Sequence, residues 1–302
     1  MTRYLLAFTI LIASLLSSCV EPFDIKTNNS PSVIVIYGYL TDEPVHHTIM
    51  VSASSPYFDI LPNPGISGAS VKITSSENEV FNFDENDTVP GLYQTVNRVS
   101  ATPGATYSLS VEVDFDNDGV KEIYTATSTM QSPVPIDSIQ VKSMEIMGYK
   151  FYSLNLYAQD PPSEDYYLGH YKLNDTAILF NISRLSPMSD IGFNGQYING
   201  LMIQRFWDEN ERENDDDDDD GDDSTYRHIY LSQGDTITFS LSRIEKGYYD
   251  FIIQCQDEMR GESPFFGGPA SNIATNISNG GLGYFTSYAF STIKTVVNEK
   301  NN

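Results

Sequence analysis

Short runs of β-branched and aromatic residues, separated by Gly, Pro, Asn and Asp, recur along most of the chain. Such runs have the composition and length of strands, and the prolines between them lack the backbone donor that a continuing strand needs. No helical period of apolar residues crosses residues 32–132. This pattern predicts an Ig-like or transthyretin-like β-sandwich over that range. The strands expected in it are 33–39, 47–51, 69–74, 91–93, 107–113 and 122–127.

One of these strands indicates which of its faces is buried. Alternate positions from Tyr107 to Phe115 are apolar, whereas Ser108, Ser110 and Glu112 between them are polar. Because successive side chains of a strand point to opposite faces, the apolar set should face the core.

Residues 132–136 read Ser-Pro-Val-Pro-Ile and predict a junction between two domains, because two prolines favour an extended link. Strand-like runs resume after the junction, so residues 133–302 are expected to form a second β-rich domain. The fold class of the whole chain is therefore expected to be mainly β. The strands expected in the second domain are 138–142, 151–158, 166–173, 177–182, 226–231 and 236–241.

One segment of the second domain, about 243–259, has the period of a helix. Its apolar residues recur at spacings that place them on one face. Ser242 and Glu245 have the spacing of a capping box, and Gly261 stands where the helix should end. Cys255 lies on the apolar stripe, so we expect a buried, unreactive thiol rather than a nucleophile. The stripe comprises Ile244, Tyr248, Phe251, Ile252, Cys255 and Met259.

The N-terminus has the layout of a bacterial lipoprotein signal. Arg3 is followed by an apolar stretch and then by Leu-Ser-Ser-Cys, which resembles a lipobox ending at Cys19. The apolar stretch is too short to cross a bilayer as a permanent helix. Residues 1–18 are therefore expected to be a removed signal peptide, Cys19 to be lipidated, and residues 19–31 to form a tether. The alternative is an ordinary secretory signal with an incidental cysteine.

Acidic residues outnumber basic ones by 41 to 17, which gives a formal net charge of −24. Such a chain repels a phosphate backbone, and this excludes nucleic acid as a partner. Twelve of the acids lie within residues 208–223, including six successive aspartates. Because like charges repel, we expect a solvated loop there. A metal site or recognition of a basic partner surface are the alternatives.

Asp114, Asp116, Asp118 and Gly119 match the start of a calcium-binding loop, in which alternate carboxylates converge on a hard cation. The acid that would close such a loop is missing, because Thr125 holds its position. The competing interpretation is a hairpin turn built around the Asn-Asp-Gly sequence at this point. We favour the turn and keep calcium as the alternative; no other cofactor is indicated.

Sequence signatures of catalysis are missing. The chain has no His-Glu-x-x-His, Cys-x-x-Cys or Gly-x-Ser-x-Gly motif and no glycine-rich phosphate loop. The adjacent His46 and His47 would point to opposite faces of a strand, so they cannot share a ligand. Paired carboxylates of the kind that hydrolyse glycosides cannot be singled out among 41 acids. No catalytic residue is therefore assigned, and the protein is not expected to be an enzyme.

Adjacent aromatic pairs such as Tyr166-Tyr167 and Tyr284-Phe285 allow two interpretations. On an extended segment, one ring of each pair would face outward and offer a binding surface for sugars, peptides or proteins. Alternatively, both rings are buried between layers of the fold. The sequence leaves both interpretations open.

Several short motifs occur in an order that resembles one known family. They are the lipobox, then residues 38–42, 55–58, 66–73, 103–109 and 135–139, and a C-terminal signature over residues 264–285. Together they resemble the Bacteroidetes lipoprotein family known as domain of unknown function 4249, of whose pattern the acidic segment 208–223 is not a part. The resemblance implies an outer-membrane lipoprotein, commonly encoded beside TonB-dependent receptors, with no catalytic residue to carry over.

Acidic residues just behind Cys19 resemble an export signal for the outer face of the outer membrane, so we expect a lipid-anchored, cell-surface protein. The expected function is binding or accessory work with a TonB-dependent receptor, in nutrient capture or envelope assembly. The alternatives are a surface hydrolase of glycans or peptides and an adhesive or structural surface protein. The sequence assigns no ligand-binding residue.

Overall fold

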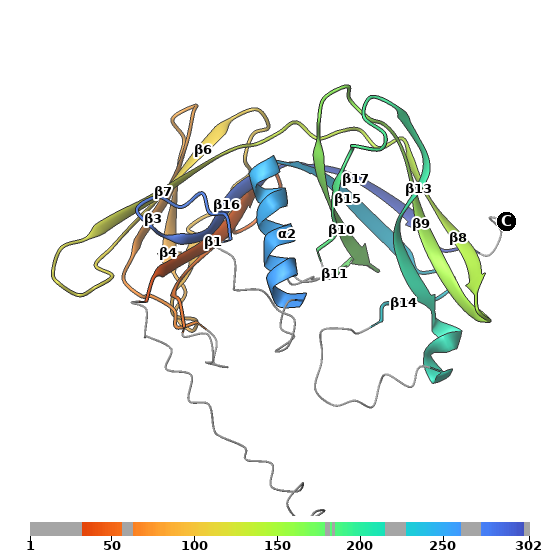
Figure 1. Cartoon of the computed structure of the whole chain (residues 1–302), viewed down its shortest axis with the longest axis horizontal. Helices are drawn as coiled ribbons and strands as arrows, with labels where there is room; N and C mark the ends of the chain where they lie inside the picture. Colours follow the sequence, from red (N-terminus) through yellow and green to blue (C-terminus); the bar gives the residue numbers. More distant parts are fainter. Residues whose placement is uncertain are drawn as a thin grey trace, which may run out of the picture. The chain divides into compact units, whose positions relative to one another are not determined.

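β-strands make up nearly all of the regular secondary structure (Figure 1). The computed structural model describes residues 32–55, 63–178, 182, 185–214, 228–260 and 273–298. Among these residues, α2 (Lys246–Arg260) is the single α-helix, and the strands lie in three sheets. The prediction of a mainly β fold with one amphipathic helix is confirmed.

The N-terminal strands lie in an eight-stranded sheet of order β16-β1-β2-β5-β4-β3-β6-β7. Its neighbours run antiparallel, except that β1 and β16 are parallel. The strands are β1 (Ile34–Thr41), β2 (Thr48–Ala53), β3 (Ser70–Ser75), β4 (Val80–Glu85), β5 (Leu92–Thr95), β6 (Thr106–Val113), β7 (Glu122–Thr129) and β16 (Leu282–Tyr288).

Alternation along the strands builds the core of the eight-stranded sheet. Tyr107, Leu109 and Val111 of β6 are at most 1% exposed, which confirms the face predicted from the sequence. They belong to one buried cluster with Ile36 of β1 and Phe285 of β16. The first and last parts of the chain therefore share this core.

β16 joins the eight-stranded sheet from the far end of the chain. It pairs with β1 at Gly283, where φ is 98° and an added Cβ would lie 2.1 Å from the carbonyl oxygen of Ile36. A side chain at this position would collide with the backbone of β1, so the close approach requires glycine. On its other side, the Ser287 N–H of β16 donates to Ser128 Oγ of β7 at 2.8 Å. β16 thus links the two ends of the sheet.

The remaining strands form two sheets with a shared core, in which Leu154 and Leu156 of one sheet meet Phe239 and Leu241 of the other. The five-stranded sheet has the order β11-β10-β15-β17 with β12 beside β10, and the four-stranded sheet has the order β14-β13-β9-β8. The five-stranded sheet comprises β10 (Tyr166–Leu173), β11 (Thr176–Ile178), β12 (Pro187–Ser189), β15 (Thr236–Ile244) and β17 (Phe290–Val296). The four-stranded sheet comprises β8 (Ser138–Ile146), β9 (Tyr149–Gln159), β13 (Tyr197–Asp208) and β14 (Tyr230–Leu231).

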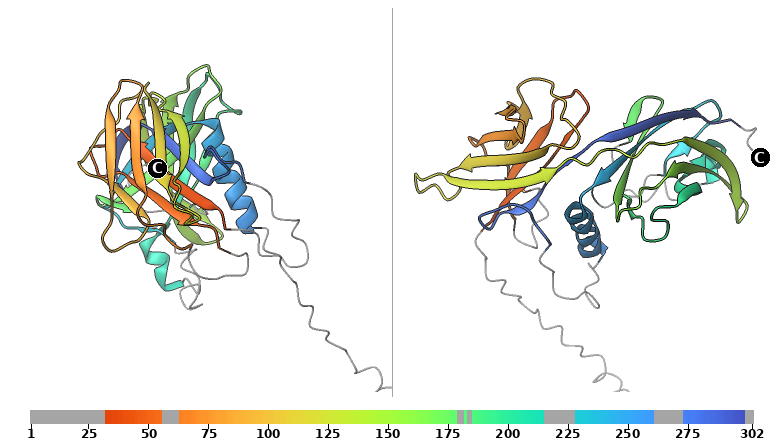
Figure 2. Two further views of the ribbon diagram at one scale, coloured as in Figure 1. Left: turned by 90° about the vertical axis from the view of Figure 1, so that its left-hand side faces the viewer. Right: turned by 90° about the horizontal axis from the view of Figure 1, so that it is seen from above.

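β16 and β17 are separated only by Ala289, so the chain passes directly from the eight-stranded to the five-stranded sheet (Figure 2). Ala289 is fully buried. The sequence patterns predict neither of these strands, and they also miss β4, β12 and β13. This one-residue connection places the end of β16 next to the start of β17 in the five-stranded sheet.

The helix α2 is capped differently from the prediction. The carbonyl of Glu245 accepts from Tyr249 N at 3.1 Å, so Glu245 itself is the N-cap residue. Its carboxylate accepts hydrogen bonds from Ser128 Oγ at 2.7 Å and Thr129 N at 3.0 Å. Ser242 is a fully buried residue of β15. The predicted capping box is therefore wrong, because the Glu245 carboxylate binds β7 of the eight-stranded sheet instead.

The apolar face of α2 packs into a third buried cluster. Tyr248 and Ile252 are at most 1% exposed and lie in this cluster with Tyr288 of β16. Met259 is 50% exposed, so the buried stripe ends before it, contrary to the prediction. The helix end expected at Gly261 lies outside the described residues.

The acidic segment begins with regular structure rather than with a loop. Asp208 ends β13 and is 6% exposed, and η2 (Glu209–Asn214) is a 3-10 helix. Residues 215–223 lie outside the described part of the chain. The described residues all belong to one compact unit that starts at Ser32. A division of that unit after residue 132 into separately folding domains stays a prediction.

Candidate functional site

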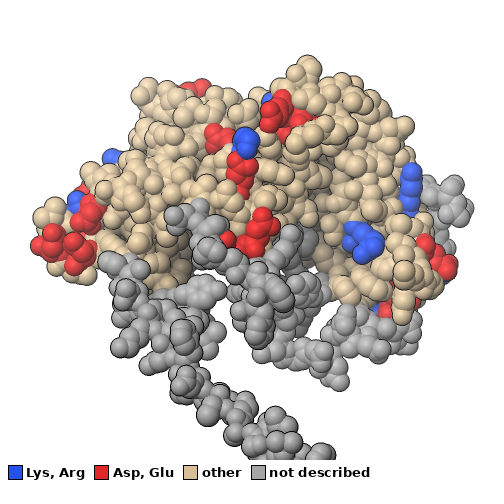
Figure 3. Space-filling model, in the orientation of Figure 1, with Lys and Arg blue, Asp and Glu red and all other residues tan. Residues whose placement is uncertain are grey.

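Three carboxylates meet at the turn between β6 and β7. Oxygens of Asp114, Asp116 and Glu122 lie within 4.8 Å of one another. Figure 3 shows acidic side chains gathered at this end of the eight-stranded sheet. Asp118 is not part of the group; its Oδ1 accepts from Val120 N at 2.7 Å. The structure thus brings together two of the three predicted ligands, Asp114 and Asp116, and adds Glu122, which was not among the predicted ligands.

These carboxylates accept backbone hydrogen bonds within the turn. Asp114 Oδ2 accepts from Gly119 N at 3.1 Å, Glu122 Oε2 accepts from Phe115 N at 2.8 Å, and Asp116 Oδ1 accepts from the N–H two residues on at 3.2 Å. Gly119 has φ of 89°, a conformation that glycine adopts without strain. The predicted hairpin turn is present, and the acids stabilise it.

A cation at this turn stays a prediction. Calcium takes about six to eight oxygen ligands, and carboxylates are among those it prefers. Asp114 Oδ1 is buried and has no hydrogen-bond partner within the described residues, so this oxygen would be open to such an ion. The backbone hydrogen bonds nevertheless account for the gathering of the three acids without any ion.

A second location is a pocket of about 200 Å³ between the eight-stranded and five-stranded sheets, here called the inter-sheet pocket. Its walls come from the end of β1, the segment before β2, strands β10, β11 and β15, and the connection between β16 and β17. Its lining includes Tyr39, Glu43, His170, Lys172, Ser240 and Tyr288.

Strand alternation explains why polar residues line the inter-sheet pocket. Tyr171 of β10 packs in the core shared by the five-stranded and four-stranded sheets and is 3% exposed. Its neighbours His170 and Lys172 therefore lie on the opposite face of β10. Ser240 of β15 stands directly opposite His170 in the register and shares that face. One face of the five-stranded sheet thus serves the core and the other serves the pocket.

Stacked rings form the inner wall of the pocket. Tyr288 is 3% exposed and stacks with both Tyr39 and His170, at centroid distances of 5.6 Å and 5.4 Å. Phe290 meets His170 edge-on at 5.0 Å. Tyr39 is 41% exposed, so part of this ring system is open at the surface.

The imidazole of His170 has an unpartnered nitrogen. Its Nε2 is buried and has no hydrogen-bond partner in the described part of the chain. Burial lowers the pKa of His170 to about 4, so the ring is neutral at neutral pH. In a neutral imidazole one nitrogen donates and the other accepts, so the tautomer decides which role Nε2 takes.

The rim of the pocket carries one opposite-charge pair. Lys172 Nζ lies 3.6 Å from Glu43 Oε1, and both side chains are close to half exposed. His46 is exposed and its Nδ1 bonds the carbonyl of Thr95 at 2.7 Å, whereas His47 is 3% exposed. Both histidines nevertheless line the inter-sheet pocket, and they precede β2 rather than lie within a strand, so their expected opposite directions on a strand are not confirmed.

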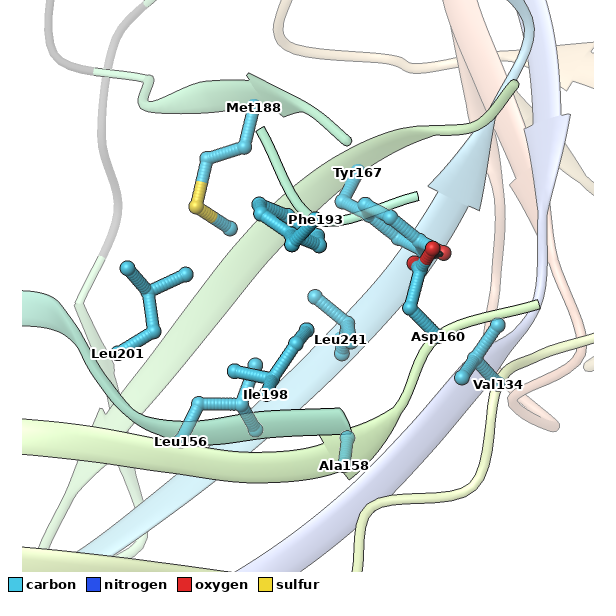
Figure 4. A pocket seen from close by; sticks show the side chains of 10 residues that line it. All are labelled: Val134, Leu156, Ala158, Asp160, Tyr167, Met188, Phe193, Ile198, Leu201 and Leu241. Atoms are coloured by element: carbon cyan, nitrogen blue, oxygen red, sulfur yellow. Dashed lines mark hydrogen bonds between the residues drawn. The ribbon is translucent and has the colours of Figure 1, made fainter. Parts of the chain in front are cut away.

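A smaller apolar pocket lies within the core between the five-stranded and four-stranded sheets (Figure 4). Leu156, Phe193 and Leu241 are among its lining residues, and its volume is about 10 Å³. This is room for about one water molecule. At its edge, Tyr167 Oη donates to Asp160 Oδ1 at 2.7 Å, and burial raises the pKa of Tyr167. We therefore interpret it as a gap in the core rather than as a ligand site.

The aromatic pairs are buried on both sides. Tyr166 and Tyr167 are 8% and 3% exposed, and Tyr284 and Phe285 are 6% and 0% exposed. Of the two interpretations that the sequence left open, burial between layers is the correct one for these pairs. The exposed aromatic of the pocket, Tyr39, belongs to no such pair.

The structure describes only one of the two cysteines, Cys255. Cys19 lies outside the described residues. Cys255 is partly buried on α2, and burial raises the pKa of its thiol to about 11, so the reactive thiolate is scarce at neutral pH. This agrees with the structural role expected for Cys255. No helix in the described ranges combines the length and the hydrophobicity that crossing a membrane requires.

The inter-sheet pocket was not predicted from the sequence. Its residues come from segments spread between Tyr39 and Phe290, and no local motif joins them. One signal was available, because His46, His47 and His170 all line the pocket in a chain with only four histidines. Without the fold, nothing in the sequence shows that these three residues share a location.

Comparison with protein families matches residues 20–294 to a family described as Domain of unknown function (DUF4249). Comparison with curated proteins gives no match. The matched range takes in both the β6–β7 turn and the inter-sheet pocket. It covers most of the chain, and the motifs that suggested the resemblance fall within it or directly precede it. The chain therefore belongs to the Domain of unknown function (DUF4249) family.

Proposed function

We propose that the protein is a lipid-anchored, non-catalytic binding or accessory lipoprotein of the outer membrane. In this proposal it works at the cell surface with a TonB-dependent receptor, in nutrient capture or envelope assembly. The observation that carries the proposal is the order along the chain: a lipobox ending at Cys19, a family match that begins at Val20, and a compact unit that begins at Ser32.

The spacing between Cys19 and the fold suits an anchored protein. Residues 20–31 are polar in large part and, if fully extended, would span at most about 40 Å. Two or more acyl chains hold a protein on a bilayer far more stably than one chain does. A lipidated Cys19 would therefore keep the fold near the membrane and leave it free to meet a partner.

The inter-sheet pocket supports a binding role. It offers about 200 Å³ lined by both aromatic and polar side chains, a combination typical of small-molecule sites. The pocket lies at a junction of two sheets that strand pairing and the core hold in place. A ligand site of this kind suits a protein that captures a nutrient for a receptor.

The anchor is tested by comparing the only two cysteines. Full-length protein is expressed in its native envelope with a clickable fatty acid, and Cys19→Ala is compared with Cys255→Ala. We expect Cys19→Ala to lose the lipid label and membrane retention in high salt, because no other cysteine is placed for acylation. Cys255→Ala should keep both. Label and retention that survive in Cys19→Ala would overturn the anchor.

The partner is tested by solubilising the native envelope and identifying what co-purifies with the lipidated protein by mass spectrometry. We expect a TonB-dependent receptor in an amount that approaches that of the bait. Turnover of a polysaccharide or peptide panel by the purified protein would instead establish the hydrolase alternative. Attachment of cells to surfaces that is lost on deletion, without a co-purifying receptor, would establish the adhesive alternative.

A further inference from the structure

Size, charge and hydrogen-bonding capacity of the inter-sheet pocket point to one kind of ligand. We propose that this pocket binds a neutral, hydroxyl-rich molecule of about the size of one monosaccharide unit. The inference rests on the proposed function for its biological use, since it names the ligand class of the proposed binding role. The binding itself is measurable without a receptor or a membrane.

The volume sets the size of the ligand. One water molecule needs about 10–15 Å³ of cavity volume. The inter-sheet pocket, with about 200 Å³, therefore has room for more than about ten waters. A ligand with about a dozen non-hydrogen atoms, such as one pyranose ring with its hydroxyl groups, fills such a space. Larger polymers would have to present a single unit to the pocket.

The rim pair favours a neutral ligand. An anion would compete with Glu43 for Lys172 and would be repelled by the net charge of −24 on the chain. A cation would have to displace Lys172 from Glu43. A neutral polar ligand leaves the pair intact, and it finds an acceptor in the carboxylate and a donor in the ammonium group. Hydroxyl groups use both, because each one donates and accepts.

The wall behind the rim also offers both hydrogen-bond donors and hydrogen-bond acceptors. Ser240 Oγ and Thr292 Oγ1 lie 2.7 Å apart and share one hydrogen bond, in which either can donate. His170 Nε2 lies buried behind this wall, and the described residues offer it no hydrogen-bond partner. Because a hydroxyl pairs with either tautomer of a neutral imidazole, it is the group best suited to this nitrogen.

Tyr39 supplies the apolar contact. Its ring stacks on Tyr288 and the residue stays 41% exposed, so an aromatic surface stands open at the pocket. The face of an aromatic ring carries partial negative charge and attracts the polarised C–H groups of a sugar ring. A hydroxyl-rich molecule that also has such C–H groups satisfies the aromatic and the polar parts of the pocket together.

The experiment titrates full-length lipidated protein, in a detergent without a sugar headgroup, with methyl glycosides of glucose, galactose, mannose and N-acetylglucosamine. Binding is followed by saturation-transfer NMR of the ligand and by the ring signals of His170. We expect at least one glycoside to bind saturably at millimolar concentration or below, and to shift the signals of His170. Glutamate, lysine and galacturonate serve as charged probes and should bind more weakly.

Matched variants locate the site. Tyr39→Ala should weaken binding by about tenfold, the loss expected for one stacking contact, whereas Tyr149→Ala should leave it unchanged. Tyr149 is also 41% exposed but lies on β9 away from the pocket lining, so it is a matched control. If Tyr39→Ala fails to fold, Lys172→Met is compared with Lys294→Met, whose ammonium pairs with Asp175 outside the pocket.

The outcomes separate this inference from the proposed function. No saturable binding of any glycoside, tighter binding of a charged probe, or equal effects of a pocket variant and its control would each overturn the inference. None of these results alters lipidation of Cys19 or co-purification with a receptor. Conversely, loss of the anchor would leave glycoside binding by the purified protein intact.

Discussion

The β6–β7 turn and the inter-sheet pocket gather their polar groups in different ways, although each leaves one buried atom, Asp114 Oδ1 or His170 Nε2, without a partner among the described residues. In the turn, Asp114, Asp116 and Glu122 each accept a hydrogen bond from the neighbouring backbone. In the pocket, His170 Nε2 has no partner within the described residues. The acids of the turn stabilise a local conformation through hydrogen bonds within their own segment, whereas the polar groups of the pocket come from strands far apart in the sequence. A dense sequence motif can therefore mark a structural element, and scattered residues can mark a site.

We expect substitutions in the inner wall of the pocket to lower the free energy of unfolding far more than substitutions in the turn. Tyr288→Ala should lower the free energy of unfolding by about 3–5 kcal/mol, because it removes a buried ring that contacts Tyr39, His170 and Phe290. Urea unfolding measures the loss, and Tyr149→Ala serves as the exposed control. If Tyr288→Ala lowers the free energy of unfolding no more than Tyr149→Ala does, the inner wall of the pocket is not part of the core.

The buried His170 predicts a change of stability with pH. The folded pKa of about 4 lies below the ordinary value of 6.5, so the unfolded chain binds a proton that the folded chain excludes between these values. Stability should therefore fall as pH drops through this window, by about 3 kcal/mol in total from this group.

The measurement compares wild type with His170→Gln in urea at pH 7 and pH 4. The carboxylates and the other histidines titrate in both proteins, so the difference between the two pH-dependent losses isolates His170. Equal losses in the two proteins would contradict the neutral, buried imidazole.

The Glu245 carboxylate ties the start of α2 to β7 of the eight-stranded sheet. Glu245→Ala should cost about 2 kcal/mol, because it removes a charged acceptor from Ser128 Oγ and Thr129 N. Asp250→Ala is the control, as Asp250 pairs with Lys246 on the exposed side of α2 and should cost less than about 1 kcal/mol. Thermal unfolding of both variants makes the comparison, and a smaller loss for Glu245→Ala than for Asp250→Ala would contradict it.

The smallest effects are expected at the turn itself. Glu122→Ala should cost about 1 kcal/mol through the lost hydrogen bond to Phe115 N, and Asp118→Ala, the control outside the carboxylate group, should cost less. Millimolar calcium should change the melting temperature of the intact protein little. If calcium raises the melting temperature saturably, and Glu122→Ala abolishes this rise while Asp118→Ala keeps it, the three carboxylates form a metal site.

The sequence predicts best where alternation is regular and uninterrupted. β6 shows its buried face directly, because Tyr107, Leu109 and Val111 alternate with polar residues. β13 breaks this rule through two irregularities in its pairing with β9, one of them next to Gly200, which has positive φ. The sequence of β16 resembles a loop because it contains Gly283. The structure shows that glycine is needed there because the backbone of β16 lies close to that of β1. The pocket takes Tyr288 from β16 and its other residues from segments that no local motif joins, so the sequence alone does not predict it.

The parallel pairing of β16 with β1 has a consequence for the order of folding. More than two hundred residues separate Ile34–Thr41 from Leu282–Tyr288, so the two strands meet only after most of the chain has been synthesised. Until then the outer edge of β1 has unpaired backbone groups, which invite association with other chains. Contacts of such long range also slow folding. We therefore expect completion of the eight-stranded sheet to be a late step, during which the emerging chain depends on protection from aggregation.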